Sequence, residues 1–160
     1  MRNTNYVNMP PMMKQKSMTQ PPAPGEGLAD ALVPAAFATM AILNKIGAEN
    51  DLSLSLIRVL GILLDRRPRM TELAEYLGLE KQTMSGLVAR AEKRGLVARA
   101  PNKDDGRATD VFLTSEGLRL VKRLRAQAQQ ALASLTGQLD IPDQQRLQEL
   151  LERMLDTRKG

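Results

Sequence analysis

With 160 residues, the chain is long enough for one compact domain and too short for two large ones. It has no Cys and no His, which excludes disulfides, thiol chemistry and the imidazole general base of many hydrolases, and removes nearly all transition-metal sites. The net charge of +5 at pH 7 favours a polyanionic partner only if the basic residues are gathered in one part of the chain.

Residues 1–26 hold five of the nine prolines and show no hydrophobic periodicity, so we expect a flexible leader. An alternative role is a non-specific phosphate contact through Arg2, Lys14 and Lys16. The leader lacks the apolar run of a secretory signal, and the most apolar stretch, residues 32–43, is shorter than the ~20 residues of a membrane span. The sequence therefore predicts a cytoplasmic protein without a membrane partner.

The next two segments have helical periodicity. A helix over about residues 28–47 is apolar around most of its girth, which predicts more than one partner surface, and Pro34 should kink it or begin its regular part. A second helix begins at the N-cap Ser53 and ends near Asp65. The core must be aliphatic, because only four residues of the chain are aromatic.

A helix-turn-helix pattern follows. A short helix capped by Thr71 ends at Gly78, which can supply the left-handed conformation of a tight turn. A further helix is predicted from about residue 81 to residue 94, and Gly95 ends it in the same way.

Residues 96–99 and 110–113 are predicted strands on either side of the turn-forming run PNKDDG. Thr114 is the N-cap of a long helix, and Asp140 with Pro142 opens a last one. Helix, turn, helix and hairpin in this order predict a winged helix-turn-helix.

The basic residues are concentrated in this region. Residues 81–107 hold seven basic residues against three acidic ones, a net charge of +4 out of +5, which is typical of a polyanion binder. The first exposed turn of the helix over 81–94 offers donors and acceptors that suit base edges in the major groove: Lys81, Gln82, Thr83 and Ser85. Arg90, further along an outward face, suits a phosphate.

The predicted hairpin adds a second reading element. Arg107 at its tip can enter a narrow minor groove, and Asp105 is placed to hold the guanidinium by a bidentate hydrogen bond. The alternative is a surface ion pair worth under ~1 kcal/mol. Arg99 and Lys103, in the same hairpin, complete the predicted DNA-binding set.

Residues 52–117 resemble the MarR family of transcriptional regulators. TELAEYLG is similar to the family's third helix and turn, and KQTMSGLVARAEKRGLV to its recognition helix and first wing strand. DDGRA followed by FLTSEG is similar to the Asp-x-Arg tip and the closing Leu-Thr-x-x-Gly signal of its wing. The chain departs from the family in having Ala91 where Leu is usual, and in lacking the cysteines of the oxidation-sensing branch.

The resemblance implies a mainly α fold with a small β-hairpin wing and six helices, the terminal helices forming a dimerisation region. The implied domains are the leader (1–26), a dimerisation helix (27–50), the DNA-binding lobe (51–115) and the C-terminal dimerisation helices (116–160).

The resemblance further implies a sequence-specific regulator, a repressor of MarR type rather than an enzyme. It would bind a palindromic operator in double-stranded DNA as a homodimer, need no cofactor and no metal, and be released by a small, often phenolic or aromatic, effector. Candidate ligand-lining residues are Phe37, Met40 and Leu60. The apolar stripes at the two ends of the chain predict the dimer interface: Leu28, Leu32, Leu147, Leu150, Leu151, Met154 and Leu155.

Three alternatives stay open. The winged lobe could bind a protein instead of DNA, or it could bind DNA without sequence preference, as a nucleoid-type protein does. An enzyme using Glu72 and Glu75 as its carboxylates is the third, but these residues lie on the outer side of a short helix without polar partners nearby in sequence.

Overall fold

The structure of the chain, a computed structural model, describes residue 23 and residues 25–156. Most of the leader, with its possible phosphate contacts Arg2, Lys14 and Lys16, therefore lies outside the described residues. The chain divides into two compact units after Pro34, so the first helix, α1 (Glu26–Glu49), belongs to both, and the core described below is that of the second unit, which begins at Ala35.

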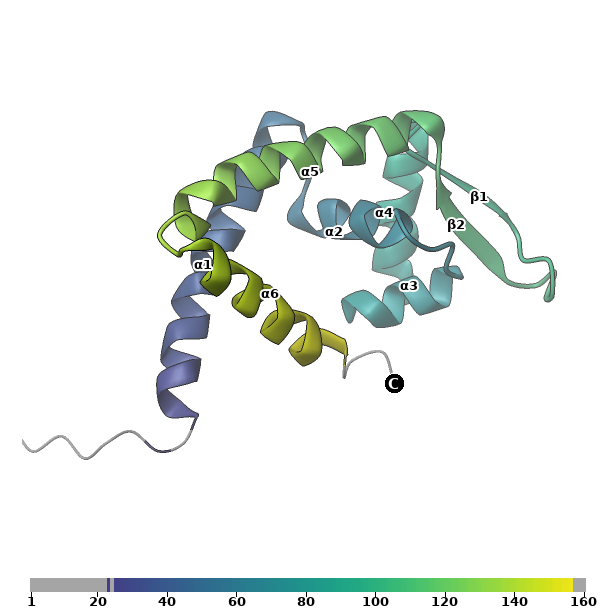
Figure 1. The fold of residues 1–160 in the computed structure, drawn as a ribbon. Helices are drawn as coiled ribbons and strands as arrows, with labels where there is room; N and C mark the ends of the chain where they lie inside the picture. Colours follow the sequence, from purple (N-terminus) through teal and green to yellow (C-terminus); the bar gives the residue numbers. More distant parts are fainter. Residues whose placement is uncertain (1–22, 24, 157–160) are drawn as a thin grey trace, which may run out of the picture. The chain divides into compact units, whose positions relative to one another are not determined.

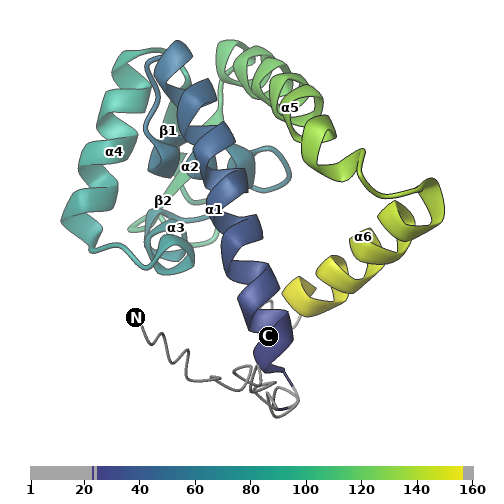
Figure 2. The same ribbon diagram turned by 90° about the vertical axis from the view of Figure 1, so that its left-hand side faces the viewer.

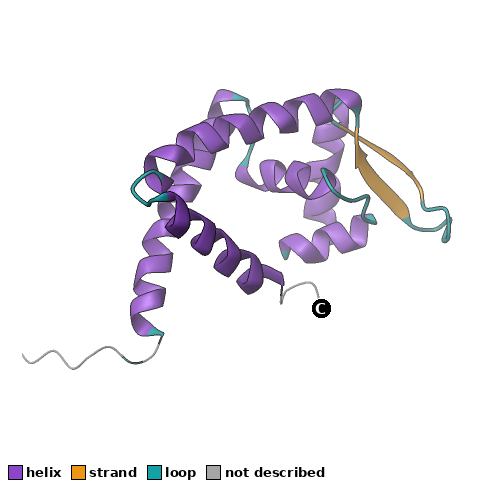
Figure 3. Cartoon of the chain, in the orientation of Figure 1, coloured by secondary structure: helices purple, strands orange, loops and turns teal. Residues whose placement is uncertain are grey.

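The described residues form six helices and one two-stranded sheet (Figures 1 and 3). In chain order the elements are α1 (Glu26–Glu49), α2 (Leu54–Leu63), α3 (Met70–Leu77), α4 (Lys81–Lys93), β1 (Val97–Pro101), β2 (Thr109–Leu113), α5 (Ser115–Thr136) and α6 (Ile141–Asp156). The predicted fold class, mainly α with a hairpin wing, is confirmed. Helix α1 continues through Pro34 and is longer at both ends than the sequence predicts.

The core is aliphatic, as composition predicts. It is formed by the carboxyl end of α1, the inner faces of α2–α5 and both strands, which Figure 2 shows grouped around α2. The largest completely buried side chains are Val59, Leu60, Leu73, Met84, Val88, Val97 and Val111. Each short helix thus buries its apolar face in the core and exposes its opposite face to solvent.

Local capping explains where most of these helices begin and end. Ser53 Oγ accepts the Leu56 N–H at 3.2 Å, and Thr114 Oγ1 accepts the Gly117 N–H at 3.0 Å, so these two of the predicted N-caps are confirmed. Gly78, at φ 64°, and Gly95, at φ 71°, adopt the left-handed conformation that ends α3 and α4.

The predicted cap at Thr71 is wrong. Arg69 is the N-cap of α3, and its backbone N–H donates to the Glu72 carboxylate at 2.9 Å. The reason is tertiary: Arg69 forms a β-bridge with Asp110, which keeps Arg69 extended and lets the helix begin at the next residue.

Strands β1 and β2 pair antiparallel, with Val97 opposite Leu113 and Pro101 opposite Thr109. The hairpin is continuous with α4 through Gly95 and with α5 through Thr114, whose side-chain hydroxyl donates to the Gly95 carbonyl at 2.5 Å. The two ends of the wing are therefore joined directly to each other and to the helices that flank them.

Helix α6 has a different character, because none of its 16 residues is buried. Its apolar side chains at positions 147, 150, 151, 154 and 155 are between 37% and 53% exposed. On α1, Leu28, Leu32 and Phe37 are likewise exposed, at 68%, 40% and 64%. A helix that keeps an apolar stripe in solvent lacks a partner surface.

The apolar segment near the amino end is longer than the sequence analysis estimates from residues 32–43. Helix α1 is 24 residues long, with an 18-residue window of mean hydropathy 1.5 that is 11% buried, so by length and composition it could cross a membrane. The sequence estimate counted only the most apolar dozen residues. One such helix near the amino end is weak evidence for a span, because a core helix or a signal sequence meets the same criteria.

The backbone of Gly117 lies so close to Leu96 that there is no room for a side chain. A Cβ at this position would stand 1.9 Å from the Leu96 carbonyl oxygen, which accepts the Thr114 N–H. We expect Gly117→Ala to lower the free energy of unfolding by ~1–3 kcal/mol, because α5 must shift away from the wing. Urea denaturation measures this change.

Gly61→Ala is the matched control. Gly61 also lies in a helix, but no heavy atom stands within 4 Å of its Cβ position, so the change should raise stability by up to ~1 kcal/mol. Equal effects of the two substitutions would contradict the proposed packing.

Candidate nucleic-acid interface

Helix α4 separates its residues by face, as the sequence predicts. Met84, Leu87, Val88 and Ala91 are buried. The side chains at the amino end of the outward face are all exposed, and no contact holds them within the described residues: Lys81, Gln82, Thr83 and Ser85. The end of the helix that meets base edges in helix-turn-helix proteins is therefore free to do so.

The amino end of α4 also carries positive potential. Its N-cap is Glu80, whose side chain makes no capping hydrogen bond, so the first backbone N–H groups remain open to an outside acceptor. Arg90 reaches back along the helix, and its Nη1 atom lies 3.7 Å from where a Cβ on Gly86 would stand. Gly86 thus leaves room for this guanidinium beside the exposed face.

Two basic residues of the segment are held by the fold itself. Arg94 donates to the backbone carbonyls of Asp51 at 2.6 Å and Asn50 at 3.2 Å. Arg99 donates through Nη2 and Nε to one oxygen of Glu92, at 2.6 and 3.0 Å. Arg94 therefore ties the end of α4 to the α1–α2 turn, and Arg99, a predicted DNA contact, would reach a phosphate only by leaving Glu92.

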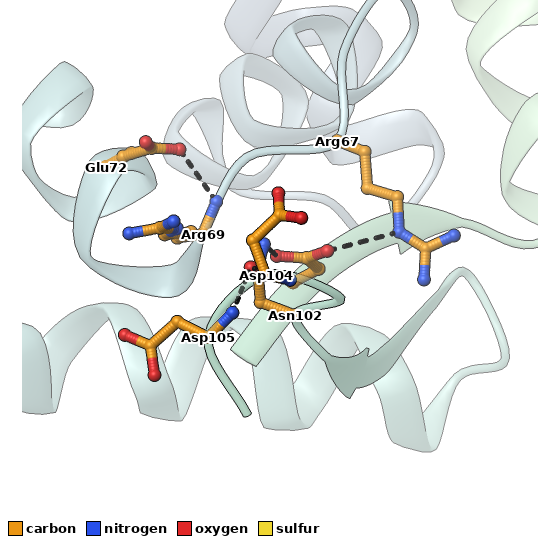
Figure 4. Close-up of polar contacts among 7 residues, drawn as sticks. Arg67, Arg69, Glu72, Asn102, Asp104 and Asp105 are labelled. Carbon is orange, nitrogen blue, oxygen red and sulfur yellow. Dashed lines mark hydrogen bonds and ion pairs between the residues drawn. The ribbon is translucent and has the colours of Figure 1, made fainter. Parts of the chain in front are cut away.

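The wing tip, residues 102–108, is organised by its own side chains. Asn102 Oδ1 accepts the N–H groups of Asp104 and Asp105, both at 3.0 Å (Figure 4). The Asp105 carboxylate in turn accepts the Arg107 N–H at 3.1 Å. These Asx-type turns replace a regular strand connection and leave the Arg107 side chain in solvent.

The predicted bidentate bond between Asp105 and Arg107 is not present. Only the Nε atom of Arg107 approaches the carboxylate, at 3.9 Å, and the Arg107 side chain is 98% exposed. The Asp105 oxygen is occupied by the backbone N–H instead, so it shapes the turn and leaves the guanidinium in solvent. Lys103 is exposed on the same loop.

Sequence reasoning missed the residues at the base of this loop. Asp110, on β2, is only 7% exposed and is the one buried charged residue in the described part of the chain. Its Oδ1 accepts from Asn102 Nδ2 at 2.7 Å, and Arg67 Nε lies 3.7 Å from its other oxygen. The sequence signal that could have identified Asp110 is an acidic residue inside a predicted strand, directly before the apolar Val111, which is completely buried.

A second group of exposed basic residues lies on the first turns of α5: Arg119, Lys122, Arg123 and Arg125. Arg119 donates a hydrogen bond to Glu116 at 2.5 Å, and this bond together with the nearby positive charge holds the pKa of the Glu116 carboxyl below its ordinary value. The basic surface is thus broader than the segment 81–107 that the sequence singles out.

A cavity of about 290 Å³ is lined by residues of α1, α2 and α5. Its lining is mostly aliphatic, from Leu43, Ile46, Ile57, Leu60, Leu64, Val121, Leu124 and Ala128, and also includes Gly61, Asp65 and Arg125. Of the predicted ligand residues, Leu60 lines this cavity and is completely buried. Phe37 and Met40 do not line it and are 64% and 37% exposed.

The predicted interface residues lie in exposed positions on α1 and α6, as described above. Within residue 23 and residues 25–156, no group of three acidic side chains is placed to hold a metal ion.

Comparisons with known proteins agree with this geometry. The model of the MarR family matches residues 50–108. The chain is 29% identical over 132 residues to the homoprotocatechuate degradative operon repressor of Escherichia coli, covering 81% of this chain and 88% of that protein. It is 30% identical over 112 residues to the HTH-type transcriptional repressor IacR of Pseudomonas putida, covering 69% and 65%.

A solved structure shows the same fold over nearly the whole chain. The crystal structure of NadR in complex with 4-hydroxyphenylacetate superposes with a TM-score of 0.67 at 22% identity, covering 91% of this chain and 97% of that one. These matches agree with the exposed polar tip of α4 and the arginine at the hairpin tip, and the chain belongs to the MarR family of winged helix-turn-helix, DNA-binding transcriptional regulators.

Proposed function

We propose that the protein is a repressor that binds a palindromic DNA operator as a homodimer and leaves it when a small aromatic acid binds. The observation that carries the DNA-binding part is the pairing of two exposed elements. The first turn of α4 presents Lys81, Gln82, Thr83 and Ser85, and the wing tip presents Arg107 in solvent. Side chains of these types suit a major groove and the adjacent minor groove.

The dimer part is supported by the apolar surface on α6 and α1. An exposed stripe over 16 residues of α6 would be costly for an isolated subunit, because apolar area in water is unfavourable. A second copy related by a two-fold axis would cover the same stripe on both subunits. Two recognition helices would then face one duplex about one turn apart, which requires an inverted repeat.

The effector part is supported by the cavity that α1, α2 and α5 line. Its volume of about 290 Å³ is near the lower end of ligand pockets, which suits a single-ring compound. Arg125 lines it and can pair with a carboxylate. Among relatives, NadR was crystallised with 4-hydroxyphenylacetate, and the E. coli repressor is named for a homoprotocatechuate operon. Phe37 and Met40 would join such a site only where a partner subunit covers them.

Arg107→Ala should weaken binding to an operator selected from a random duplex library by about tenfold, because the minor-groove contact is lost. The selected duplexes should contain an inverted repeat. Fluorescence anisotropy with a labelled duplex measures the dissociation constant at fixed salt.

The control is Arg146→Ala, which removes the same charge from α6, where Arg146 pairs with Glu149 at 3.2 Å. Both variants should keep a strong salt dependence, with binding weakened by roughly two orders of magnitude or more between 50 and 200 mM salt. Equal affinities of the two variants would argue for a protein-binding wing, and selection without any repeat would favour the nucleoid-type alternative.

Leu151→Glu should convert the dimer to a monomer and abolish operator binding at nanomolar concentrations, because a buried unpaired carboxylate opposes association across the two-fold axis. Sedimentation equilibrium measures the change. Gln145→Glu adds the same charge to an exposed position of α6 and should leave the dimer intact. A wild-type monomer, or partition into vesicles through α1, would contradict the dimer proposal.

Millimolar 4-hydroxyphenylacetate should release the wild-type protein from its operator, and Arg125→Met should abolish release while changing the DNA affinity without effector no more than Arg123→Met does. Arg123→Met is the matched control, because Arg123 is exposed on the same helix and does not line the cavity. Release that persists in Arg125→Met would remove this arginine from the effector site.

A further inference from the structure

The buried carboxylate of Asp110 occupies an unusual place for a charge. It lies on β2 opposite Ala100, next to the completely buried Val111. A carboxylate that is withdrawn from water is tolerated only where hydrogen bonds or opposite charges compensate it. Asp110 has such partners on two sides: Asn102 Nδ2 donates to it at 2.7 Å, and Arg67 Nε lies 3.7 Å away.

Asn102 continues this connection into the wing tip. Its amide nitrogen is bound to Asp110, while its Oδ1 atom accepts the backbone N–H groups of Asp104 and Asp105. The backbone N–H of Asn102 also donates to the Ala108 carbonyl at 2.8 Å, which closes the loop from its other end. One amide side chain therefore holds the tip in shape and anchors it to the strand.

The opposite side of Asp110 faces the connection between α2 and α3, residues 64–69. Val111 donates its N–H to the Pro68 carbonyl at 3.0 Å, and Asp110 forms the β-bridge with Arg69 that begins α3. The Arg67 guanidinium lies 3.9 Å from the centre of the Phe112 ring, a cation–π contact that keeps Arg67 on β2 (Figure 4 shows Arg67 and Arg69 on this segment). Asp110 thus contacts both the segment that leads into α3 and, through Asn102, the wing tip.

We propose that Asp110 and Asn102 are positioning residues, which set the direction in which the wing tip presents Arg107 to DNA. The order of contacts is Arg67 and the α2–α3 connection, then Asp110, then Asn102, then the turn that Asp105 shares with Arg107. This inference rests on the proposed function, in which Arg107 contacts the duplex. Neither Asp110 nor Asn102 touches DNA in this scheme; both act through Arg107.

A purely structural role for Asp110 makes a different prediction. If the carboxylate served stability alone, its substitutions would change unfolding and affinity in proportion. A positioning role separates them, because Arg67 is exposed and Asn102 is only partly buried, so water can replace the carboxylate beside both partners when it is removed. Asp110→Leu should therefore keep the unfolding midpoint near that of the wild type and still weaken operator binding.

The experiment exchanges the donor and the acceptor of the 2.7 Å bond in the full-length protein. Asn102→Asp keeps the oxygen that the tip N–H groups need but puts a carboxylate against Asp110 in place of a donor. We expect operator binding about tenfold weaker, the size of one lost hydrogen bond to a charged group. The double variant Asn102→Asp/Asp110→Asn restores the bond with reversed polarity and should recover most of the affinity.

Coupling to Arg107 is the second readout. In an Arg107→Ala background, Asn102→Asp and Asp110→Leu should cause no further loss of affinity, because the group they position is gone. Additive losses in that background would overturn the proposal, as would failure of the double variant to recover affinity while it remains folded by circular dichroism. If Asn102→Asp does not fold, Asp110→Leu carries the same test.

The two hypotheses fail in different ways. If the proposed function is wrong, Arg107→Ala itself leaves duplex binding unchanged. If only the positioning role is wrong, Arg107→Ala weakens binding strongly while Asn102→Asp and Asp110→Leu bind the operator as the wild type does.

Discussion

The burial of one face of α4 is the constraint on which the rest of the lobe depends. Met84, Leu87, Val88 and Ala91 fit into the aliphatic core, and this fixes the rotation of the helix about its own axis. With the rotation set, the residues between them must face solvent. Ala91, near the end of the helix before the wing begins, is completely buried, so the inward face of α4 extends to this point.

Some basic residues of the lobe stabilise the fold, and others remain free in solvent to bind a polyanion. Arg94 holds the α1–α2 turn through two carbonyl groups, and Arg99 is held by Glu92, so both guanidiniums contribute to the fold. Lys81 and Arg107 remain in solvent, where a charge loses no hydration on folding and can displace counterions from a polyanion. Counting charges along the chain cannot make this division, because it depends on which acceptors the fold brings within hydrogen-bonding distance of each guanidinium.

Apolar surface is divided in the same way. The lobe buries its aliphatic residues, while α6 leaves all of its own exposed. These two patterns look alike in sequence, since both repeat at helical spacing. The difference lies in the number of surfaces that one subunit can offer: a small lobe has a single core, and an additional apolar stripe needs a second molecule.

The sequence by itself determined the elements and their order. Helical periodicity, the caps Ser53 and Thr114 and the left-handed glycines at 78 and 95 are local features, and each depends on residues within one turn of the chain. The polar tip of α4 and the exposure of Arg107 followed from the same local pattern. The wing was predictable as a hairpin because its turn residues are contiguous.

Only the tertiary structure decided how these elements are joined. Arg69 replaces Thr71 as the cap of α3 because a strand residue 41 positions later, Asp110, pairs with it. Gly117 is required because α5 passes against the Leu96 carbonyl, and Asn102 anchors the wing tip because Asp110 is buried beside it. Such contacts join residues far apart in the chain, and their energy depends on distances and burial that no local pattern encodes.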